Sequence, residues 1–420
     1  MNEHADAPAV ERAEGAAARR VCVVGLGYIG LPTAAVLASR GFEVHGTDVS
    51  RHAVDTINAG RAHIVEPDLD MLVQAGVATG RLRAHTEAAP ADVFVLCVPT
   101  PLDAERRPDL SYVDAAAELI APHLAPGNLV VLESTSPPGT TERLAGTLRR
   151  RSGLDAAALH VVHAPERVLP GRILREVVEN DRIVGGVDEP STAHGAAFYG
   201  GFVAGRVLET GARTAECAKL VENAYRDVNI AFANELSMVA ETLGIDVREL
   251  IALANHHPRV NILSPGPGVG GHCIAVDPYF LIDAAPGETP LIAAARAVNS
   301  AKPDWVVERV ARLAARFRSP VIACLGLAYK PDIDDLRESP ALAIVRALGA
   351  RLEDASLRVV EPNIGAHPEF ELADAADAVR EADIVVVLVG HREFRRLSAG
   401  QLAEKVVLDT CGALARDTGP

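Results

Sequence analysis

Residues 21–30 read VCVVGLGYIG, an apolar run that passes directly into a glycine-rich turn. The apolar run predicts a strand over 21–24, and the residues after the turn predict a helix over 31–40. A second apolar run over 42–47 predicts another strand, which ends at Asp48. This is the strand–turn–helix–strand context that a GxGxxG motif needs before it indicates a dinucleotide site.

Each glycine of this motif has a separate expected role. Gly25 would make the tight turn, Gly27 would clear space for a pyrophosphate, and Gly30 would let the helix pack on the strand. The helix N-terminus would face the phosphates with its partial positive charge. Asp48 would accept hydrogen bonds from the ribose hydroxyls and repel a 2′-phosphate, so the pattern favours NAD over NADP.

The alternation of strand and helix patterns continues beyond this unit, which predicts a parallel α/β sheet. Further strands are expected over 92–98, 129–132 and 160–162, with a helix over 111–121. Ligands of parallel sheets bind at the carboxyl ends of the strands.

Three polar residues directly follow these predicted strands and are therefore site candidates: Thr100, Thr135 and Glu166. For a single threonine in such a loop, capping of the local backbone is the alternative interpretation. Glu166 either accepts a proton or simply pairs with the neighbouring Arg167.

Composition describes a globular chain of 420 residues, 49% hydrophobic and 23% charged, which is long enough for two or three domains. The net charge of −15 argues against general binding to nucleic acid or to a membrane surface. No apolar run reaches the ~18 residues of a membrane span. The six cysteines are far apart and form no CxxC pair, which favours reduced thiols and a cytoplasmic protein. Residues 1–19 have no apolar core of a signal sequence and are expected to form a disordered tail.

Residues 266–277 read GPGVGGHCIAVD and place a single cysteine, Cys273, in a loop dense in glycine. Glycines allow positive φ and close approach of the backbone to a ligand. A thiol in such a loop is placed for nucleophilic attack. The alternative is a structural loop with a buried, inert cysteine.

A long helix is expected to begin near Thr210 or Thr214 and to end at Leu243, before a glycine. It carries Lys219 and Asn223, which are four residues apart and so lie on one face. An ammonium and an amide arranged in this way can stabilise a negative oxygen. A solvated lysine and a surface asparagine are the alternative.

Apolar neighbours on this helix favour the functional interpretation, because they predict that most of the helix is buried. These neighbours are Leu220, Val221, Ala224, Val228, Ile230 and Ala231. Farther along, His256, His257 and His272 raise the question of a metal, but no carboxylate lies at ligand spacing, so no metal site is expected.

The last third predicts a second α/β sheet, with strands over 321–325, 357–360, 384–389 and 406–409. It has no GxGxxG motif. Lys330 and Arg337 follow its first strand and suit an anionic ligand such as a nucleotide diphosphate. Surface pairing with Asp332, Asp334 and Asp335 is the alternative.

Together these motifs resemble the UDP-glucose/GDP-mannose dehydrogenase family from about Arg20 to Ala415. The resemblance rests on GLGYIG, on the run from Glu133 to Thr141, and on APERVLPG, AKLVEN, GPGVGGHCIAVDP and GLAYKPDIDDLRESP. The segments 165–186, 222–237 and 257–278 are most similar to members that oxidise UDP-N-acetyl-D-mannosamine.

The resemblance implies an α/β fold of two Rossmann-like, doubly wound domains joined by a central helical dimerisation region. The expected NAD-binding domain covers 20–208, the helical domain with the catalytic loop 209–316, and the UDP-sugar-binding domain 317–420. A homodimer is expected.

The resemblance also assigns catalytic roles. Cys273 corresponds to the thiol that forms a thiohemiacetal and then a thioester. Lys219 and Asn223 correspond to the pair that stabilises the oxyanion at C6, and Glu166 to a carboxylate used in proton transfer and thioester hydrolysis. Two further residues would orient the catalytic water and the lysine, namely Asp277 and Thr135.

The remaining implied positions contact ligands. For the cofactor, NAD, they are Gly25, Gly27, Tyr28, Ile29, Gly30, Asp48, Arg51, Thr100, Thr135 and Arg337. For the UDP-sugar they are Arg167, Val168, Lys219, Asn223, Gly270, Lys330 and Arg259, the last reaching the site of the partner subunit.

The implied reaction is a four-electron oxidation of the C6 alcohol of UDP-N-acetyl-D-mannosamine by NAD. The same chemistry on UDP-N-acetylglucosamine or UDP-glucose stays open as an alternative. Two other classes compete with this interpretation: a two-electron dehydrogenase of the hydroxyacid type, and a nucleotide-sugar sensor without turnover.

Overall fold

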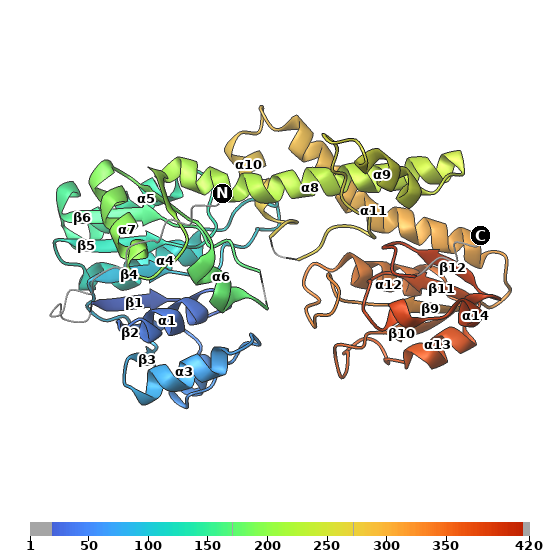
Figure 1. Cartoon of the computed structure of the whole chain (residues 1–420), viewed down its shortest axis with the longest axis horizontal. Coiled ribbons are helices and arrows are strands. Elements are labelled where there is room, and N and C mark those ends of the chain that lie inside the picture. Colours follow the sequence, from blue (N-terminus) through green and yellow to red (C-terminus); the bar gives the residue numbers. More distant parts are fainter. Residues whose placement is uncertain (1–18, 170, 272, 415–420) are drawn as a thin grey trace, which may run out of the picture. The chain divides into compact units, whose positions relative to one another are not determined.

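The computed structural model describes residues 19–169, 171–271 and 273–414 (Figure 1). All but the last residue of the predicted tail lies outside the described residues. The chain divides into two compact units, one ending at Lys219 and the other beginning at Leu220. Both of these residues belong to one long helix, α8 (Ala212–Leu243).

The first unit contains a sheet with the strand order β3-β2-β1-β4-β5-β6-β7-β8. Its strands are parallel except where β7 runs antiparallel to β6. The predicted strands are all present, and the sequence did not reveal β3, β7 or β8. The strands are β1 (Arg20–Val24), β2 (Glu43–Thr47), β3 (Leu82–His85), β4 (Val93–Leu96), β5 (Asn128–Leu132), β6 (Leu159–His163), β7 (Arg182–Gly186) and β8 (Val207–Gly211).

Helices cover both faces of this sheet, which explains why its central strands are apolar without alternation. In β1, Val21 and Val23 belong to one core, while Cys22 and Val24 belong to the other. The first core is covered by α1 (Gly30–Ser39), α2 (Arg51–Asn58), α3 (Leu69–Ala78), α6 (Ile173–Glu179) and α7 (Glu189–Gly200). The second is covered by α4 (Ser111–Ile120) and α5 (Thr140–Ser152).

The helix α8 differs from its prediction in two ways. It begins at Ala212, directly after β8, so neither predicted cap is used: Thr210 is in the strand and Thr214 is in the first turn. The helix is also less buried than predicted, because the side chain of Val221 is 53% exposed. The spacing alone could not show which apolar face has a covering element.

Three more helices follow in the second unit: α9 (Val247–Asn255), α10 (Asp277–Ala284) and α11 (Pro290–Ala314). Asp246 caps α9 by accepting a hydrogen bond from the Arg248 amide, as an aspartate in this position should. The helix α11 begins at Pro290, and proline suits the first position of a helix.

The second unit also contains a parallel sheet of strand order β10-β9-β11-β12. One face is covered by α11 and α12 (Pro340–Arg351), and the other by α13 (Ala375–Glu381) (Figure 1). This confirms the expected second α/β unit. The strands are β9 (Val321–Leu325), β10 (Ser356–Val360), β11 (Ile384–Val387) and β12 (Val406–Asp409), and a short helix, α14 (Ala399–Leu402), precedes the last.

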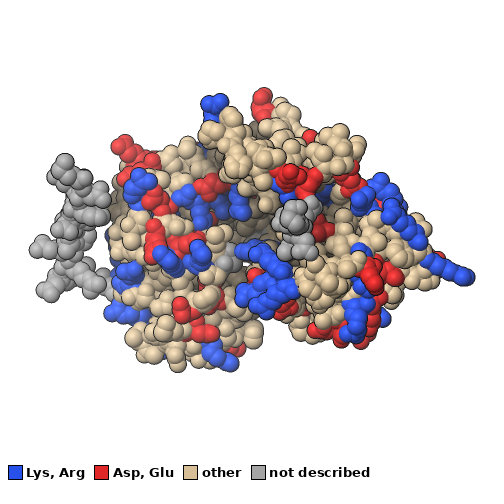
Figure 2. Space-filling view, turned by 45° about the vertical axis from the view of Figure 1, so that its right-hand side comes forward, with Lys and Arg blue, Asp and Glu red and all other residues tan. Residues whose placement is uncertain are grey.

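Charged side chains of both signs are interspersed on the face shown in Figure 2. Among the described residues, no helix is long and apolar enough to cross a membrane.

Candidate active site

The glycine-rich turn between β1 and α1 has the form that its motif predicts. Gly25 has φ +87°, and a Cβ there would lie 2.7 Å from the Cys97 carbonyl oxygen. A Cβ on Gly30 would lie 1.7 Å from the carbonyl oxygen of Gly25. At Gly27, by contrast, a Cβ would meet no described heavy atom within 4 Å. The tight turn, the close packing and the open position are therefore all confirmed.

Asp48 stands at the end of β2 with its carboxylate fixed beside this turn. One oxygen accepts a 2.8 Å hydrogen bond from the Leu26 amide and the other a 2.8 Å bond from the Ser50 amide. Within the part of the chain that the structure describes, no side chain caps the start of α1, whose N-cap residue is Ile29. Tyr28 and Arg51 are exposed beside the turn. The open space at Gly27, the uncapped N-terminus of α1 and the fixed carboxylate of Asp48 together suit the binding of a dinucleotide.

Thr100 and Thr135 follow the neighbouring strands β4 and β5 and meet in the structure. The Thr100 hydroxyl donates a 2.7 Å hydrogen bond to the Thr135 carbonyl oxygen. The Ser134 hydroxyl binds the Val98 carbonyl oxygen at 2.7 Å in the same way. These contacts join the two loops at the carboxyl edge of the sheet, where ligands bind.

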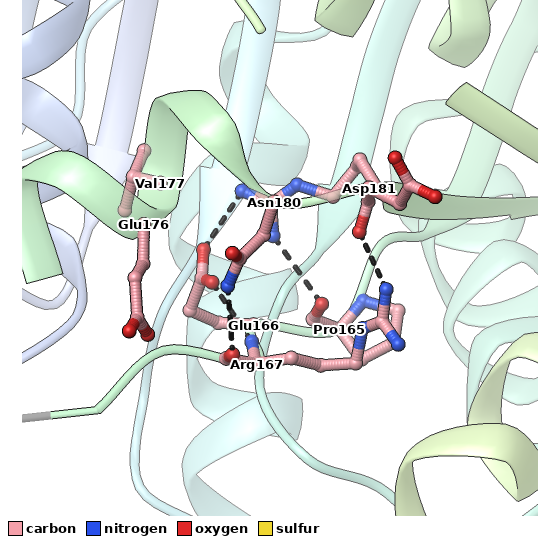
Figure 3. Close-up of a pocket in the computed structure, with 8 residues that line it drawn as sticks. Pro165, Glu166, Arg167, Glu176, Val177, Asn180 and Asp181 are labelled. Atoms are coloured by element: carbon pink, nitrogen blue, oxygen red, sulfur yellow. Dashed lines mark hydrogen bonds and ion pairs between the residues drawn. The ribbon is translucent and has the colours of Figure 1, made fainter. Parts of the chain in front are cut away.

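Glu166 follows β6 and is buried. One of its oxygens accepts a 2.8 Å hydrogen bond from the Arg167 amide (Figure 3). The other lies 2.7 Å from Nη2 of Arg182, in β7, whose side chain is only 5% exposed. Sequence reasoning considered Arg167 as the ionic partner and did not find Arg182. Glu166 and Arg182 are 16 residues apart in the sequence, so their pairing gives no local signal.

Arg182 also lies near a second buried acid, Glu133, which follows β5. Its Nη2 is 3.5 Å from Glu133 Oε1, and the Tyr199 hydroxyl donates a 2.6 Å hydrogen bond to that oxygen. Burial raises the pKa of Glu133, and Arg182 offsets only part of that effect. Burial opposes the charge of Arg182 too, but Glu166 and Glu133 outweigh it and raise the pKa of the guanidinium.

A small pocket opens beside this cluster (Figure 3). Arg167 lies along it and donates through Nη2 to the Asp181 carbonyl oxygen, while Asn180 donates to the Arg167 carbonyl oxygen. Val168, predicted to contact the sugar nucleotide, packs against the apolar core of the first unit. The residues lining the pocket are Pro165, Glu166, Arg167, Glu176, Val177, Asn180, Asp181 and Arg182.

On α8, Lys219 is half-buried and Asn223 is buried, one helical turn apart. Nδ2 of Asn223 donates a 2.6 Å hydrogen bond to Oδ2 of Asp277, the first residue of α10. The structure therefore brings together two residues that the sequence had assigned to the same reaction. The Asp277 amide in turn donates to the Cys273 carbonyl oxygen at 2.8 Å, so the cysteine stands one turn before α10.

The cysteines of the chain differ sharply in environment. Cys273 is exposed, whereas the other five are buried or half-buried. Burial raises the pKa of Cys22, and that of Cys324 to about 12. A thiol must ionise to act as a nucleophile, so the buried cysteines are inert and the exposed Cys273 is the chemical candidate.

The glycines before Cys273 serve a purpose that the sequence did not suggest. A Cβ on Gly268 would lie 2.8 Å from the side chain of Pro340, and one on Gly271 would lie 2.7 Å from the ring of Tyr329. The amide of Gly271 donates to the Arg337 carbonyl oxygen at 3.2 Å. These glycines let the loop pack on the segment 326–340, rather than only on a ligand as the sequence suggested.

Asparagines hold the earlier part of this loop, which has no regular secondary structure. Asn255 of α9 binds both the amide and the carbonyl of Ile262. From α8, Oδ1 of Asn229 accepts from the Leu263 amide at 3.2 Å, and Oδ1 of Asn234 accepts from the Gly266 amide at 2.9 Å. Sequence reasoning missed all three, because an asparagine on a helix surface is common.

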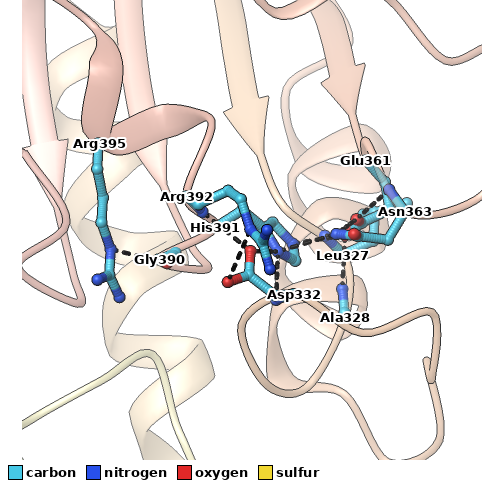
Figure 4. A network of polar contacts seen from close by, with 9 residues as sticks. All are labelled: Leu327, Ala328, Asp332, Glu361, Asn363, Gly390, His391, Arg392 and Arg395. Carbon is cyan, nitrogen blue, oxygen red and sulfur yellow. Dashed lines mark hydrogen bonds and ion pairs between the residues drawn. The ribbon is translucent and has the colours of Figure 1, made fainter. Parts of the chain in front are cut away.

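The segment 326–340, which carries Lys330 and Arg337, is fixed at the carboxyl edge of the second sheet (Figure 4). Buried Glu361 accepts hydrogen bonds from the amides of Leu327 at 2.7 Å and Ala328 at 2.9 Å. Nε2 of His391 also contacts Glu361, at 3.0 Å, and Nδ1 of His391 accepts from the Asp332 amide at 2.9 Å. Burial alone would raise the pKa of Glu361, but these hydrogen bonds lower it to about 2.

The two basic residues of this segment have different surroundings. Arg337 pairs with Asp335 at 2.6 Å and its side chain is 51% exposed, so the predicted surface pairing is observed for this residue. Asp332 instead pairs with Arg392, at 3.4 Å. Lys330 is half-buried.

Other predicted positions lie at the surface. Arg259 is exposed, as are His256 and His257, while His272 lies outside the described residues. Among the residues described, no group of three or more metal-ligating side chains is placed to hold an ion.

Three family models match the chain in order. They are the NAD-binding domain of the UDP-glucose/GDP-mannose dehydrogenase family over residues 19–203, its central domain over 213–301 and its UDP-binding domain over 323–416.

Two curated relatives and one solved structure are similar over nearly the whole chain. An NDP-N-acetyl-D-galactosaminuronic acid dehydrogenase from Ralstonia solanacearum is 56% identical and covers 94% of this chain and 96% of its own. A UDP-N-acetyl-D-mannosamine dehydrogenase from Campylobacter jejuni is 52% identical, with coverages of 89% and 96%. The structure of a UDP-D-ManNAc dehydrogenase from Pyrococcus horikoshii, 40% identical, superposes with a TM-score of 0.88 over 96% of this chain and 97% of its own.

These similarities agree with the fold described above. They confirm the expected NAD cofactor and the arrangement of an N-terminal NAD-binding domain, a central helical region and a C-terminal UDP-binding domain. The chain therefore belongs to the UDP-glucose/GDP-mannose dehydrogenase family of NAD-dependent nucleotide-sugar dehydrogenases.

Proposed function

We propose that this enzyme oxidises the C6 alcohol of UDP-N-acetyl-D-mannosamine to the carboxylate in a four-electron reaction through Cys273. The observation that carries the proposal is the contrast among its cysteines, of which only Cys273 is exposed. It follows the glycine loop and precedes α10, whose first residue binds Asn223.

Oxidation of an alcohol to an acid requires the removal of two hydrides. Bound NAD supplies the hydride acceptor, and two molecules are consumed for each alcohol. After the first oxidation, Cys273 adds its sulfur to the aldehyde carbon and the aldehyde oxygen takes up a proton, which gives a thiohemiacetal. Loss of the second hydride to NAD and of the hydroxyl proton to a base leaves a thioester, and water then breaks the carbon–sulfur bond to release the acid and the thiol.

Each oxygen intermediate carries negative charge that the site must stabilise. Lys219 supplies an ammonium and Asn223 an amide. An amide nitrogen has two N–H donors; one is committed to Asp277, which fixes the orientation of the group and leaves the second to face the substrate oxygen.

Proton transfer is assigned to Glu166, and the orientation of the hydrolytic water to Asp277 and Thr135. Glu166 is buried and lines a small pocket, so its position is restrained. NAD is assigned to the turn at 25–30 with Asp48, and the UDP moiety to the C-terminal unit with Lys330 and Arg337.

The sugar is proposed from the relatives. Members from Campylobacter jejuni and Yersinia pestis that are named UDP-N-acetyl-D-mannosamine dehydrogenases are 52% and 48% identical. An N-acetylgalactosamine nucleotide is the second candidate, because the 56% identical relative is named for N-acetyl-D-galactosaminuronic acid. The shared feature is a 2-acetamido sugar, so UDP-glucose should be a poor substrate.

We also propose a homodimer. Exposed apolar side chains repeat along α8 at Val221, Tyr225 and Phe232, which are 53%, 62% and 51% exposed. Their spacing of four and seven residues places them on one helical face. Light scattering of the wild type and of Phe232→Glu tests this: the variant should be a monomer, and an unchanged mass would contradict the proposed face.

The experiment for the proposed function is an incubation of purified enzyme and NAD with a panel of nucleotide sugars, followed by NADH absorbance. UDP-N-acetyl-D-mannosamine should give the highest kcat/KM. UDP-N-acetyl-D-galactosamine, UDP-N-acetylglucosamine and UDP-glucose are the comparison arms. A higher kcat/KM for any of them would reassign the sugar, and absence of NADH with all would favour a sensor without turnover.

A further inference from the structure

Two buried acids of the first unit share a single guanidinium. Glu133 and Glu166 follow the adjacent parallel strands β5 and β6, and Arg182 comes from β7. The side chains are 0%, 6% and 5% exposed, respectively. An ionised carboxylate this deeply buried is costly unless a charge or several hydrogen bonds compensate it.

The guanidinium is held in place from several sides. Its Nη1 donates to the Pro165 carbonyl oxygen at 3.2 Å, and its carbon lies 4.6 Å from the centre of the Tyr199 ring. Nη2 lies closer to Glu166, at 2.7 Å, than to Glu133, at 3.5 Å. The contact with Glu166 is a close ion pair rather than an aligned hydrogen bond. Arg182 is therefore a fixed positive charge that favours Glu166.

Glu133 has a different set of partners, which are neutral donors. The Tyr199 hydroxyl binds it at 2.6 Å, the Cys97 thiol at 3.2 Å and the Thr33 hydroxyl at 3.4 Å. Glu166 receives the Arg167 amide and the charge of Arg182. Arg182 consequently interacts more strongly with Glu166, which lines the pocket, than with Glu133.

We propose that Arg182 is a positioning residue for the proton acceptor: its guanidinium holds the Glu166 carboxylate in place and supplies the positive charge beside it, while Glu133 competes for that charge. This inference rests on the proposed function, in which Glu166 takes part in proton transfer. Without Arg182, burial would drive Glu166 to its neutral form, which cannot accept a proton. With Arg182 but without Glu133, the carboxylate would be stabilised too strongly to be an effective base.

Glu166 is paired with Arg182 from β7 and shares its pocket with the adjacent Arg167, Glu176 of α6 and Asp181 before β7. On the other side of Arg182 lies Glu133 after β5, to which Tyr199 of α7 and Cys97 after β4 are bound. Arg182 and Glu133 have opposite charges, so replacing each by a neutral residue should shift the acidic side of the pH profile in opposite directions.

The test is the pH profile of kcat for Arg182→Gln and Glu133→Gln, compared with the wild type. On the acidic side of the profile, which we call the acid limb, kcat falls as the proton acceptor is protonated. In Arg182→Gln the acid limb should move to higher pH by about one unit, so that the ionised fraction of the acceptor at a given pH on that limb is about tenfold smaller. In Glu133→Gln it should move to lower pH. Arg182→Lys keeps the charge and should retain a limb close to that of the wild type.

A matched control is the buried pair Arg296 and Asp227 of the second unit, which lie 2.6 Å apart with side-chain exposures of 6% and 0%. Arg296→Gln should lower the unfolding temperature without moving the acid limb. NAD binding and thermal unfolding verify that each variant is folded. If Arg182→Gln does not fold, Glu133→Gln still decides, because a limb that stays or moves to higher pH would overturn the inference.

Glu166→Gln separates this inference from the function on which it rests. If Glu166→Gln loses kcat while Arg182→Gln keeps the wild-type limb, Arg182 has only a structural role and the inference fails alone. If Glu166→Gln keeps the wild-type kcat and profile, then Glu166 is not the proton acceptor and that part of the proposed function fails.

Discussion

A Cβ placed on Gly270 would lie 2.5 Å from the carbonyl oxygen of Glu338, so these two residues meet without room for any side chain at position 270. The contact joins the loop that carries Cys273 to the segment that carries Arg337, both in the second unit. It explains why the loop is dense in glycine: the residues are small because another backbone is close, in addition to any ligand.

Gly270→Ala should therefore disturb both loops. A backbone atom cannot move aside for a new methyl group as a flexible side chain can. Overpacking of this kind therefore lowers the free energy of unfolding by about 1–3 kcal/mol. Acid formation should fall, since Cys273 lies three residues away. Thermal unfolding and NADH assays measure the two effects. Gly266→Ala is the matched control, because its Cβ would find its nearest neighbour only at 3.8 Å; equal losses in both variants would refute the packing argument.

Cys273→Ser should retain NAD binding and lose acid formation. The exposed thiol supplies the nucleophile, and a serine hydroxyl is far weaker at neutral pH. NAD titration and product analysis check the two parts. Cys217→Ser serves as the control, because Cys217 is a half-buried cysteine of α8 without an assigned role. Unchanged acid production in Cys273→Ser would remove the thiol from the mechanism.

Asp48→Asn should relax the choice of cofactor. Its amide oxygen can still accept the hydrogen bond that Leu26 now gives to Asp48 at 2.8 Å. The charge that repels a 2′-phosphate is lost, so the preference for NAD over NADP, as a ratio of kcat/KM, should fall by about tenfold, or about 1.4 kcal/mol. Asp55→Asn, at an exposed position of α2, controls for a general charge effect. An unaltered ratio in Asp48→Asn would argue against contact with the ribose.

His163 predicts acid sensitivity of the fold. Burial lowers the pKa of this fully buried histidine from 6.5 to about 3, and the Leu132 carbonyl offsets only a small part. Below pH 6.5 the unfolded chain takes up a proton that the folded chain excludes. Its contribution to stability is thus complete above pH 6.5 and is lost toward pH 3, by about 1.4 kcal/mol for each pH unit.

Denaturant unfolding of the wild type and His163→Leu between pH 4 and 8 measures this contribution. The slope of unfolding free energy against pH should decrease in the variant. Exposed His257→Leu, as a control, should keep the wild-type slope. Equal slopes for all three proteins would contradict this, because they would show that His163 takes up its proton at the same pH in the folded and the unfolded chain.

Sequence patterns sufficed for local features of the fold and of the cofactor site. The turn at Gly25 and Gly30 and the acid at Asp48 follow each other within one strand–helix–strand unit, so their geometry is determined by neighbours in the chain. The apolar runs likewise predicted the central strands. The edge strand β8 was missed because its residues are partly exposed and include Glu209 and Thr210.

Contacts between residues distant in sequence could not be predicted from such local patterns. Glu133, Glu166 and Arg182 are brought together by the order of β5, β6 and β7, and no spacing along the chain reveals that order. The pairing of Asn223 with Asp277 spans 54 residues. The exposure of Val221 depends on what packs on α8, which a helical period does not show.

In the proposed mechanism, one thiol retains the substrate through two successive oxidations. The most direct test is the molar ratio of NADH formed to UDP-N-acetyl-D-mannosamine consumed at completion, with the product identified by mass. We expect a ratio of two and a carboxylate at C6. A ratio of one with release of an aldehyde would contradict this mechanism and would favour a two-electron dehydrogenase.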